Sequence, residues 1–245
     1  MAAEAASVWL VVPTYNEADN IEALVGAVRK VLPTSRRILI VDDSSPDGTG
    51  RIADRLAAEH DDVEVLHRPL KEGLGPAYLA GFRRALEQGA DLVVQMDADF
   101  SHDPAFLPRF IDAARNADLV LGSRYVPGGG VTEWGPTRRI VSRGGSAYAR
   151  VMLGVRVRDL TGGFKCWRRE ALEAVDLDSV ASRGYAFQVE MTYRAIEAGF
   201  RVVEVPIVFR DRRVGTSKMT GAIVAEAIWR VPAMRLRRSA RHRNR

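Results

Sequence analysis

Short apolar runs alternate with amphipathic stretches through the first half of this chain, and this alternation limits its fold more than any other feature. A short apolar run predicts a buried strand, and apolar residues at helical spacing predict a helix. The two patterns recur about every 30 residues, which is the length of a βαβ unit. The sequence therefore predicts an α/β fold with a mostly parallel sheet flanked by helices. The predicted strands are residues 8–12, 37–41, 63–66, 92–96 and 119–122, and the predicted helices are residues 18–32, 49–60, 75–88 and 104–115.

The second half of the chain has a less regular pattern. Its first predicted helix contains Gly144 and Gly145, which predict an interruption because glycine is a poor helix former. Its predicted strand contains Pro206, which favours an edge position because proline cannot donate a hydrogen bond to a neighbouring strand. The predicted helices are residues 138–153, 186–198 and 219–231, and the predicted strand is residues 202–208.

Composition excludes several classes of protein. The chain has 245 residues, of which 47% are hydrophobic, as expected for one sizeable globular domain with or without an appendage. No apolar run approaches the roughly 18 residues of a membrane-spanning helix, and the first residues lack the basic segment of a secretion signal. Cys166 is the only cysteine, so no disulfide can form within the chain, and a reducing cytosol is expected. We expect Cys166 to be a packed small hydrophobe.

The positive charge of the chain is concentrated at its end. Seven arginines and no acidic residue lie from Arg230 onward, which leaves 29 basic against 31 acidic residues in the rest of the chain. Apolar residues adjoin these arginines; among them, Trp229 directly precedes Arg230 and Leu236 lies between Arg235 and Arg237. We therefore divide the chain into a main folded domain, residues 1–218, and an amphipathic, basic segment, residues 219–245, that could lie at a membrane interface. A solvated tail is the alternative; a nucleic-acid arm is disfavoured because the body has no second basic patch.

Acidic residues follow three of the predicted strands. Asp97 and Asp99 follow residues 92–96, Glu17 follows the first strand, and Asp42 and Asp43 end the second. In parallel sheets, ligands bind at the carboxyl ends of the strands. Carboxylate oxygens favour Mg²⁺ or Mn²⁺, which proteins hold together with substrate phosphates. These positions predict a site for a metal and a nucleoside diphosphate, whereas the missing glycine-rich turn after the first strand disfavours an NAD or FAD enzyme.

Six segments give the chain a family resemblance. Together they resemble the family 2 glycosyltransferases with the GT-A fold and, within them, the polyprenol (dolichol) phosphate mannose synthases. The first three segments mark the wider group, and the Ser-Pro-Asp-Gly-Thr run and the last segment point to the mannose synthases. The segments are residues 12–17 (VPTYNE), 41–49 (VDDSSPDGT), 96–102 (MDADFSH), 122–125 (GSRY), 161–165 (TGGFK) and 209–218 (FRDRRVGTSK).

The resemblance implies roles for individual residues. It implies a metal held by Asp97 and Asp99, and an acceptor phosphate near Arg124, Arg138 and Ser142. Asp97, Asp99 and Arg124 would carry catalysis. The residues implied in binding the nucleotide sugar are Pro13, Tyr15, Glu17, Val41, Asp43, Asp97, Ala98, Asp99, Arg212 and Lys218.

The resemblance also implies a reaction. The expected enzyme transfers mannose from GDP-mannose to polyprenyl phosphate with inversion, and it needs Mg²⁺ or Mn²⁺. It would work as a peripheral protein on the cytoplasmic face of the membrane, with or without an anchoring membrane protein, and it would not bind nucleic acid. Because a phosphate acceptor needs no strong base, Glu190 would contact sugar hydroxyls, and His102 is a candidate neighbour of the metal site. The alternatives are a UDP-sugar transferase acting on a lipid phosphate or polysaccharide, and a non-catalytic protein that binds nucleotide sugars.

Overall fold

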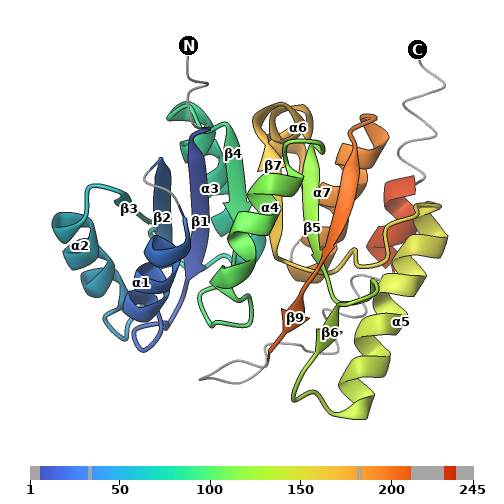
Figure 1. Ribbon diagram of the computed structural model, residues 1–245, viewed down its shortest axis with the longest axis horizontal. Coiled ribbons are helices and arrows are strands. Elements are labelled where there is room, and N and C mark those ends of the chain that lie inside the picture. The colour runs from blue at the N-terminus through green and yellow to red at the C-terminus, as the bar shows by residue number, and fades with distance from the viewer. Residues whose placement is uncertain (1–5, 33–34, 181, 183, 211–228, 236–245) are drawn as a thin grey trace.

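The computed structural model describes residues 6–32, 35–180, 182, 184–210 and 229–235. Its centre is a seven-stranded sheet with the order β3-β2-β1-β4-β7-β5-β8 (Figure 1). All neighbouring strands are parallel except the two pairs made by β7, so the predicted mostly parallel α/β sheet is confirmed. The strands are β1 (Val8–Thr14), β2 (Arg36–Asp42), β3 (Val63–His67), β4 (Leu92–Gln95), β5 (Leu119–Ser123), β7 (Lys165–Arg168) and β8 (Val202–Pro206).

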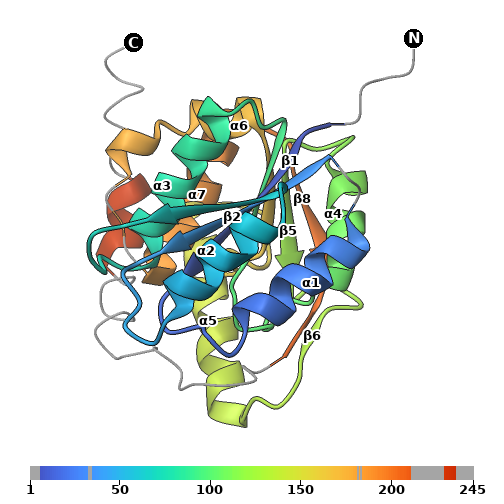
Figure 2. The same cartoon turned by 90° about the vertical axis from the view of Figure 1, so that its left-hand side faces the viewer.

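Helices cover both faces of this sheet (Figures 1 and 2). Along β1, Val8, Leu10 and Val12 pack on one face, and Trp9 and Val11 pack on the other. Because both faces are buried, the strands read as nearly continuous apolar runs, and this is why the sequence revealed most of them. The first face carries α1 (Ile21–Val31), α2 (Thr49–Glu59) and α4 (Leu107–Ala113) with the 3₁₀ turn η1 (Pro104–Phe106), and the second carries α3 (Leu74–Glu87), α6 (Arg169–Ala174) and α7 (Gly184–Glu197).

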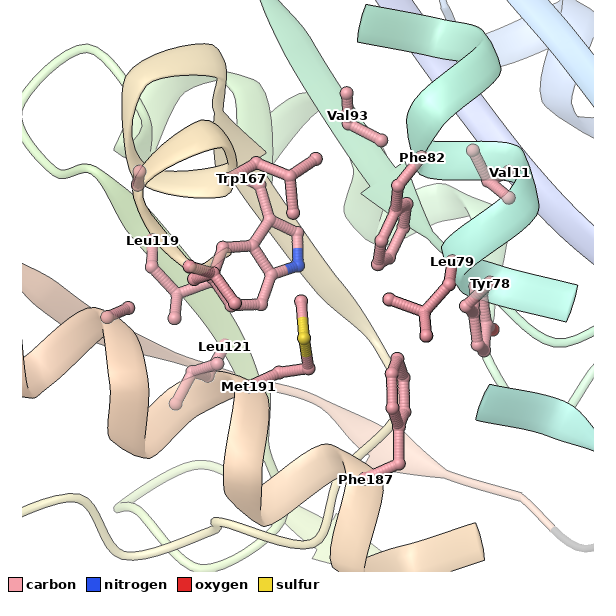
Figure 3. Packing of buried hydrophobic residues seen from close by; sticks show 14 of the residues in the cluster. Val11, Tyr78, Leu79, Phe82, Val93, Leu119, Leu121, Trp167, Phe187 and Met191 are labelled. Atoms are coloured by element: carbon pink, nitrogen blue, oxygen red, sulfur yellow. The ribbon is translucent and has the colours of Figure 1, made fainter. Parts of the chain in front are cut away.

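Aromatic side chains fill the second face. Trp167 of β7 packs in one cluster with Phe82 of α3 and with Met191 and Phe187 of α7 (Figure 3). Tyr78 stacks on both Phe82 and Phe187, at ring-centroid distances of 5.6 and 6.2 Å. This packing fixes α3 and α7 against the sheet, and it therefore fixes the side chains that these helices direct toward the carboxyl ends of the strands.

A smaller unit lies beside the main sheet. Strands β6 (Gly130–Val131) and β9 (Val208–Phe209) pair in parallel, and α5 (Pro136–Leu153) follows β6 (Figure 1). A short 3₁₀ turn, η2 (Leu177–Ser179), precedes α7. Residues 229–235 form a helical segment that contacts α5 through a hydrogen bond from Arg235 to the Met152 carbonyl, 2.9 Å long. No helix among the described residues is long and apolar enough to cross a membrane.

Three predictions about the second half need correction. The interruption of α5 at Gly144 and Gly145 was wrong: the helix is continuous, and both glycines lie on its exposed side. Two exposed glycines weaken a helix by about 1 kcal/mol each relative to alanine, and the buried side of the helix offsets this cost. The predicted strand 202–208 is two strands, β8 and β9, although the edge position of Pro206 is confirmed. Strand β7 was missed, and most of the predicted helix 219–231 lies outside the described residues.

Candidate active site

The strand order places the three acidic segments together. Strands β2 and β3 lie on one side of β1 and β4 lies on the other, so the connections reverse direction between β1 and β4. Ligands bind in open α/β sheets at the carboxyl ends of the strands beside such a reversal. Glu17 follows β1, Asp43 follows β2, and Asp97 and Asp99 follow β4. The predicted metal residues and the predicted nucleotide residues Glu17 and Asp43 therefore share one edge of the sheet.

Backbone strain is concentrated at this edge. Asn16, Ser44 and Phe100 have positive φ angles of 60°, 57° and 60°, and they lie in the loops that follow β1, β2 and β4. Non-glycine residues adopt this conformation at a cost and do so most often at functional sites. The strained loops therefore support a binding site at the same edge.

Asp97 is held by two groups. Tyr78 Oη donates to Asp97 Oδ1 at 2.9 Å, and the Asp97 amide donates to His102 Nδ1 at 3.1 Å. Burial, reinforced by the Asp97 charge, raises the pKa of Tyr78 well above its usual value, so the phenol keeps its proton. Burial lowers the pKa of His102, which favours the neutral ring, and because Nδ1 accepts a hydrogen bond, the proton is on Nε2. His102 was expected beside this site, whereas Tyr78 was missed because it reads as a core residue of α3.

Asp99 and Ser101 form the other half of this acidic segment. Asp99 is 4% exposed, and its Oδ1 accepts a hydrogen bond from the Ser101 amide at 3.0 Å. The buried Ser101 hydroxyl has no hydrogen-bond partner within the part of the chain that the structure describes. Two carboxylates and a spare hydroxyl are hard oxygen ligands, so this donor set fits Mg²⁺ or Mn²⁺. The described residues contain no group of three or more His, Cys, Asp or Glu able to hold a metal, so substrate phosphates and water would complete the coordination.

The loop after β3 brings two cations to the predicted nucleotide residues. Arg68 donates to Asp43 Oδ1, and the Lys71 ammonium lies 3.5 Å from the centroid of the Tyr15 ring. Burial raises the pKa of Asp43, and Arg68 opposes that rise. Neither cation was predicted; two basic residues shortly after a predicted strand were the only sequence signal.

The remaining nucleotide residues differ in how they are placed. Glu17 Oε2 accepts a hydrogen bond from Asn20, and the Glu17 amide donates to Thr49 Oγ1, both at 2.9 Å. Pro13 is paired with Val41 in the β1–β2 register. The side chains of Val41 and Ala98 are buried in the core, so they are not open to a ligand in this structure. Arg212 and Lys218 lie outside the described residues.

The predicted acceptor residues gather around two aromatic rings. The Arg138 guanidinium lies 4.3 Å from the centroid of Trp134, and the Arg124 guanidinium lies 5.6 Å from the same ring. Ser142 Oγ accepts a hydrogen bond of 2.6 Å from the Tyr125 hydroxyl. The structure thus brings Arg124, Arg138 and Ser142 into one cluster, although Arg124 directly follows β5 and the other two lie on α5.

Arg124 also has a protein counterion that the sequence did not reveal. Its Nε and one terminal nitrogen each donate to Asp159 at 2.7 Å, and its side chain is only 5% exposed. Burial disfavours the Asp159 carboxylate, but Arg124 more than compensates and lowers the pKa of Asp159 below its usual value. Thr161 accepts a further hydrogen bond from Arg124. Any contact of Arg124 with an acceptor phosphate would therefore be made by a guanidinium already oriented by Asp159.

The Glu190 carboxylate is held by two groups of the protein. Its two carboxylate oxygens accept hydrogen bonds from the Ser182 amide and from Arg194, and its side chain is 7% exposed. Arg194 in turn donates to the carbonyls of Val175 and Ser179. Glu190 thus anchors the segment that precedes α7, and the expected contact with a sugar hydroxyl stays a prediction.

The acidic edge and the arginine cluster are neighbours. The His102 ring stacks on Phe164 at 4.9 Å and meets Phe209 edge-on at 5.7 Å, and Phe209 also lies 5.5 Å from the Arg124 guanidinium. One site therefore offers carboxylates for a metal–diphosphate complex on one side and cations for an anionic acceptor on the other.

The chain is similar to known proteins in sequence and in fold. The model of glycosyl transferase family 2 matches residues 9–176. The chain is 52% identical to an undecaprenyl-phosphate mannosyltransferase of Micrococcus luteus, over 90% of each chain. It is 50% identical to a polyprenol monophosphomannose synthase of Mycolicibacterium smegmatis, over 91% of this chain and 84% of that protein. Its fold matches glucosyl-3-phosphoglycerate synthase of Mycobacterium tuberculosis solved with Mg²⁺ and UDP, with a TM-score of 0.68 and 18% identity over 94% of this chain and 79% of that one. The chain belongs to glycosyl transferase family 2, and its fold is of the GT-A type.

Proposed function

We propose that this protein transfers mannose from GDP-mannose to a polyprenyl phosphate with inversion, giving β-mannosyl phosphoryl polyprenol and GDP. Two relatives with about half of their residues identical over most of the chain are named as mannosyltransferases acting on lipid phosphates of this kind. The observation that carries the proposal is the pairing of two unlike sites around His102 and Phe209. Asp97 and Asp99 lie on one side, and the Arg124 cluster lies on the other.

The acidic side suits a sugar diphosphate donor. Asp97, Asp99 and the Ser101 hydroxyl would hold Mg²⁺ or Mn²⁺, which stabilises the negative charge of a leaving diphosphate. Tyr78 and the backbone contact to His102 keep Asp97 in place without neutralising it. Asp43, oriented by Arg68, has a carboxylate able to accept hydrogen bonds from the N–H groups of guanine.

The basic side suits a phosphate acceptor. A phosphate monoester is already ionised at neutral pH, so it needs orientation by cations more than it needs a general base. Arg124 and Arg138 are the candidate cations; the Trp134 ring lies against both guanidinium groups, and the Phe209 ring lies against that of Arg124. Glu190, the acidic residue considered as a base, is committed to Ser182 and Arg194. These features support direct attack by the acceptor on the sugar, which inverts its anomeric configuration.

The outer side of α5 supports peripheral membrane association at the cytoplasmic face. The helix contains four arginines and no acidic residue, and Ile140 and Val151 on its surface are 71% and 69% exposed. Trp229, in the neighbouring helical segment, is 81% exposed. Exposed apolar residues among arginines favour an interface with anionic lipid. We propose that this surface and residues 219–245 together hold the enzyme near its lipid substrate, with or without an anchoring membrane protein.

A donor panel tests the proposal. Purified protein would be given GDP-mannose, UDP-glucose or UDP-GlcNAc with one polyprenyl phosphate and Mg²⁺ or Mn²⁺, and lipid-linked sugar would be measured. We expect transfer from GDP-mannose, dependent on both lipid and metal. Transfer from a UDP-sugar instead would establish the alternative donor, and nucleotide-sugar binding without turnover would indicate a non-catalytic protein.

A further inference from the structure

Three buried side chains form a hydrogen-bonded chain that ends beside Asp97. Trp167 Nε1 donates to Gln95 Oε1 at 3.1 Å, and Gln95 Nε2 donates to Gln188 Oε1 at 2.9 Å. Trp167 and Gln95 are fully buried, and Gln188, on α7, is 2% exposed. Gln95 ends β4, two residues before Asp97, so this chain lies next to the acidic edge.

The chemistry of this chain fixes the direction of each amide. An indole nitrogen can only donate, so Gln95 must present its oxygen to Trp167. The amino group of Gln95 then faces Gln188, which must in turn present its own oxygen. A reversal of either amide would place two donors against each other. The amino group of Gln188 is therefore directed away from Gln95, whatever the neighbouring residues are.

This amino group has no partner and lies close to Asp97. Gln188 Nε2 is buried and makes no hydrogen bond within the described part of the chain, which is unusual for a buried donor. A Cβ atom built on Gly163 would lie 3.5 Å from Gln188 Nε2, 3.8 Å from Asp97 Oδ1 and 3.4 Å from His102 Cε1. Gly163 therefore marks a position between an unused donor and a carboxylate acceptor.

A hydroxyl group fits between these two partners. It can accept from Gln188 Nε2 and donate to Asp97 Oδ1, whereas a phosphate oxygen can only accept and would be repelled by the carboxylate. In a nucleotide sugar, hydroxyls belong to the ribose and to the hexose. The predicted nucleotide residues Tyr15 and Asp43 follow β1 and β2, whereas Gln188 packs against β4 and β7, nearer to the arginine cluster.

We propose that Gln188 is a specificity-determining residue that recognises one hydroxyl of the hexose being transferred, together with Asp97. This inference rests on the proposed function, and it adds a residue that recognises the sugar. Gln188 Nε2 is closed to solvent in this structure, so binding of the hydroxyl would require a shift of the adjoining Gly162–Gly163 segment. That segment has no side chain to obstruct the approach.

Two variants test this subsite from different sides. Gly163→Ala leaves Gln188 in place and adds a methyl group that meets all its neighbours at ordinary contact distances, so the fold should tolerate it. Gln188→Met removes the donor at similar volume, and its melting temperature would show whether the unpaired Gln95 amide disturbs folding. Gly26→Ala in α1, where an added Cβ has nothing within 4 Å, is the matched control for Gly163→Ala.

Affinities for GDP and GDP-mannose would be measured for each protein, together with kcat/KM for GDP-mannose and its 2-, 3-, 4- and 6-deoxy analogues. We expect Gly163→Ala and Gln188→Met to lose about tenfold in kcat/KM and in GDP-mannose affinity, the scale of one hydrogen bond, with GDP affinity unchanged. For the wild type and the control, one deoxy analogue should have a clearly lower kcat/KM than GDP-mannose. For Gly163→Ala and Gln188→Met, the same analogue should have nearly the same kcat/KM as GDP-mannose.

Two results would overturn the assignment. An equal loss of GDP affinity would place the hydroxyl on the ribose, and unchanged kinetics in both folded variants would leave Gln188 without a role in recognition. Transfer of mannose by the wild type tests the proposed function separately. If another nucleotide sugar proves to be the donor, the same comparison with that sugar and its nucleotide still decides the role of Gln188.

Discussion

Replacement of Lys165 by methionine should stabilise this protein at neutral pH. Lys165 lies on β7, is fully buried, and donates hydrogen bonds of 2.7 Å to the Gln188 carbonyl and 2.9 Å to Thr192 Oγ1. Burial lowers the pKa of its ammonium from 10.5 to about 7, although the Asp159 charge opposes the change. Thr192 Oγ1 also donates to the Gln188 carbonyl, so this carbonyl keeps a partner when the lysine is removed.

The lowered pKa has a definite consequence for stability. Between pH 7 and 10.5 the unfolded chain binds a proton on Lys165 that the folded chain binds less well, so the free energy of unfolding rises with pH in this window. A shift of this size corresponds to about 5 kcal/mol at about 1.4 kcal/mol per pKa unit. The two hydrogen bonds favour the charged form, so we take this as an upper limit and expect Lys165→Met to gain about 2–5 kcal/mol at pH 7.

Urea unfolding of the wild type, Lys165→Met and a control, Lys30→Met, between pH 7 and 9.5 would test this reasoning. Lys30 is exposed on α1, so its replacement should leave the pH dependence unchanged. The stability difference between Lys165→Met and wild type should be largest at pH 7 and shrink toward pH 9.5. A variant less stable than wild type at pH 7, with an unchanged pH slope, would show that the buried ammonium is a net stabilising group and would refute the argument.

Three further predictions concern the proposed reaction. Asp99→Ala should lower turnover at least about 100-fold with little change in melting temperature, because it removes a strong electrostatic contact rather than a core contact. Turnover near that of the wild type, with metal still required, would exclude Asp99 as a metal ligand. Arg124→Lys keeps a charge beside Asp159 but loses the two-pronged geometry, so KM for polyprenyl phosphate should rise about tenfold or more while GDP affinity is kept; an equal loss of GDP affinity would assign Arg124 to the donor site. Truncation after Lys218 should weaken binding to anionic vesicles and leave GDP binding intact, and vesicle binding by the full chain should fall as salt rises. Equal vesicle binding by the truncated and full-length proteins would show that the tail is a solvated extension.

The sequence predicted those parts of the fold and site that depend on local pattern. Strands β1, β2, β4 and β5 contain apolar runs buried on both faces, and the acidic residues Asp43, Asp97 and Asp99 lie shortly after two of them. Their convergence at one edge followed from parallel strand order alone. Strand β7 gave no such signal, because it is four residues long and its buried Lys165 breaks the apolar run. The continuous course of α5 was also hidden, since packing of the helix overrides the low helix propensity of its two glycines.

The residues that the sequence did not reveal are those whose partners lie far away along the chain. Tyr78 and Asp97 are 19 residues apart, Arg124 and Asp159 are 35 apart, and Gln95 and Gln188 are 93 apart. Tyr78, Asp159 and Gln188 are buried polar groups that only the tertiary fold places beside predicted residues. Local pattern therefore identifies many of the groups that would contact substrates, whereas the tertiary fold brings in the groups that orient them, such as Tyr78 and Asp159. Substitutions in this second set should alter the geometry of the site without removing any predicted ligand, so their effects would be expected in the discrimination between donors or acceptors as well as in overall turnover.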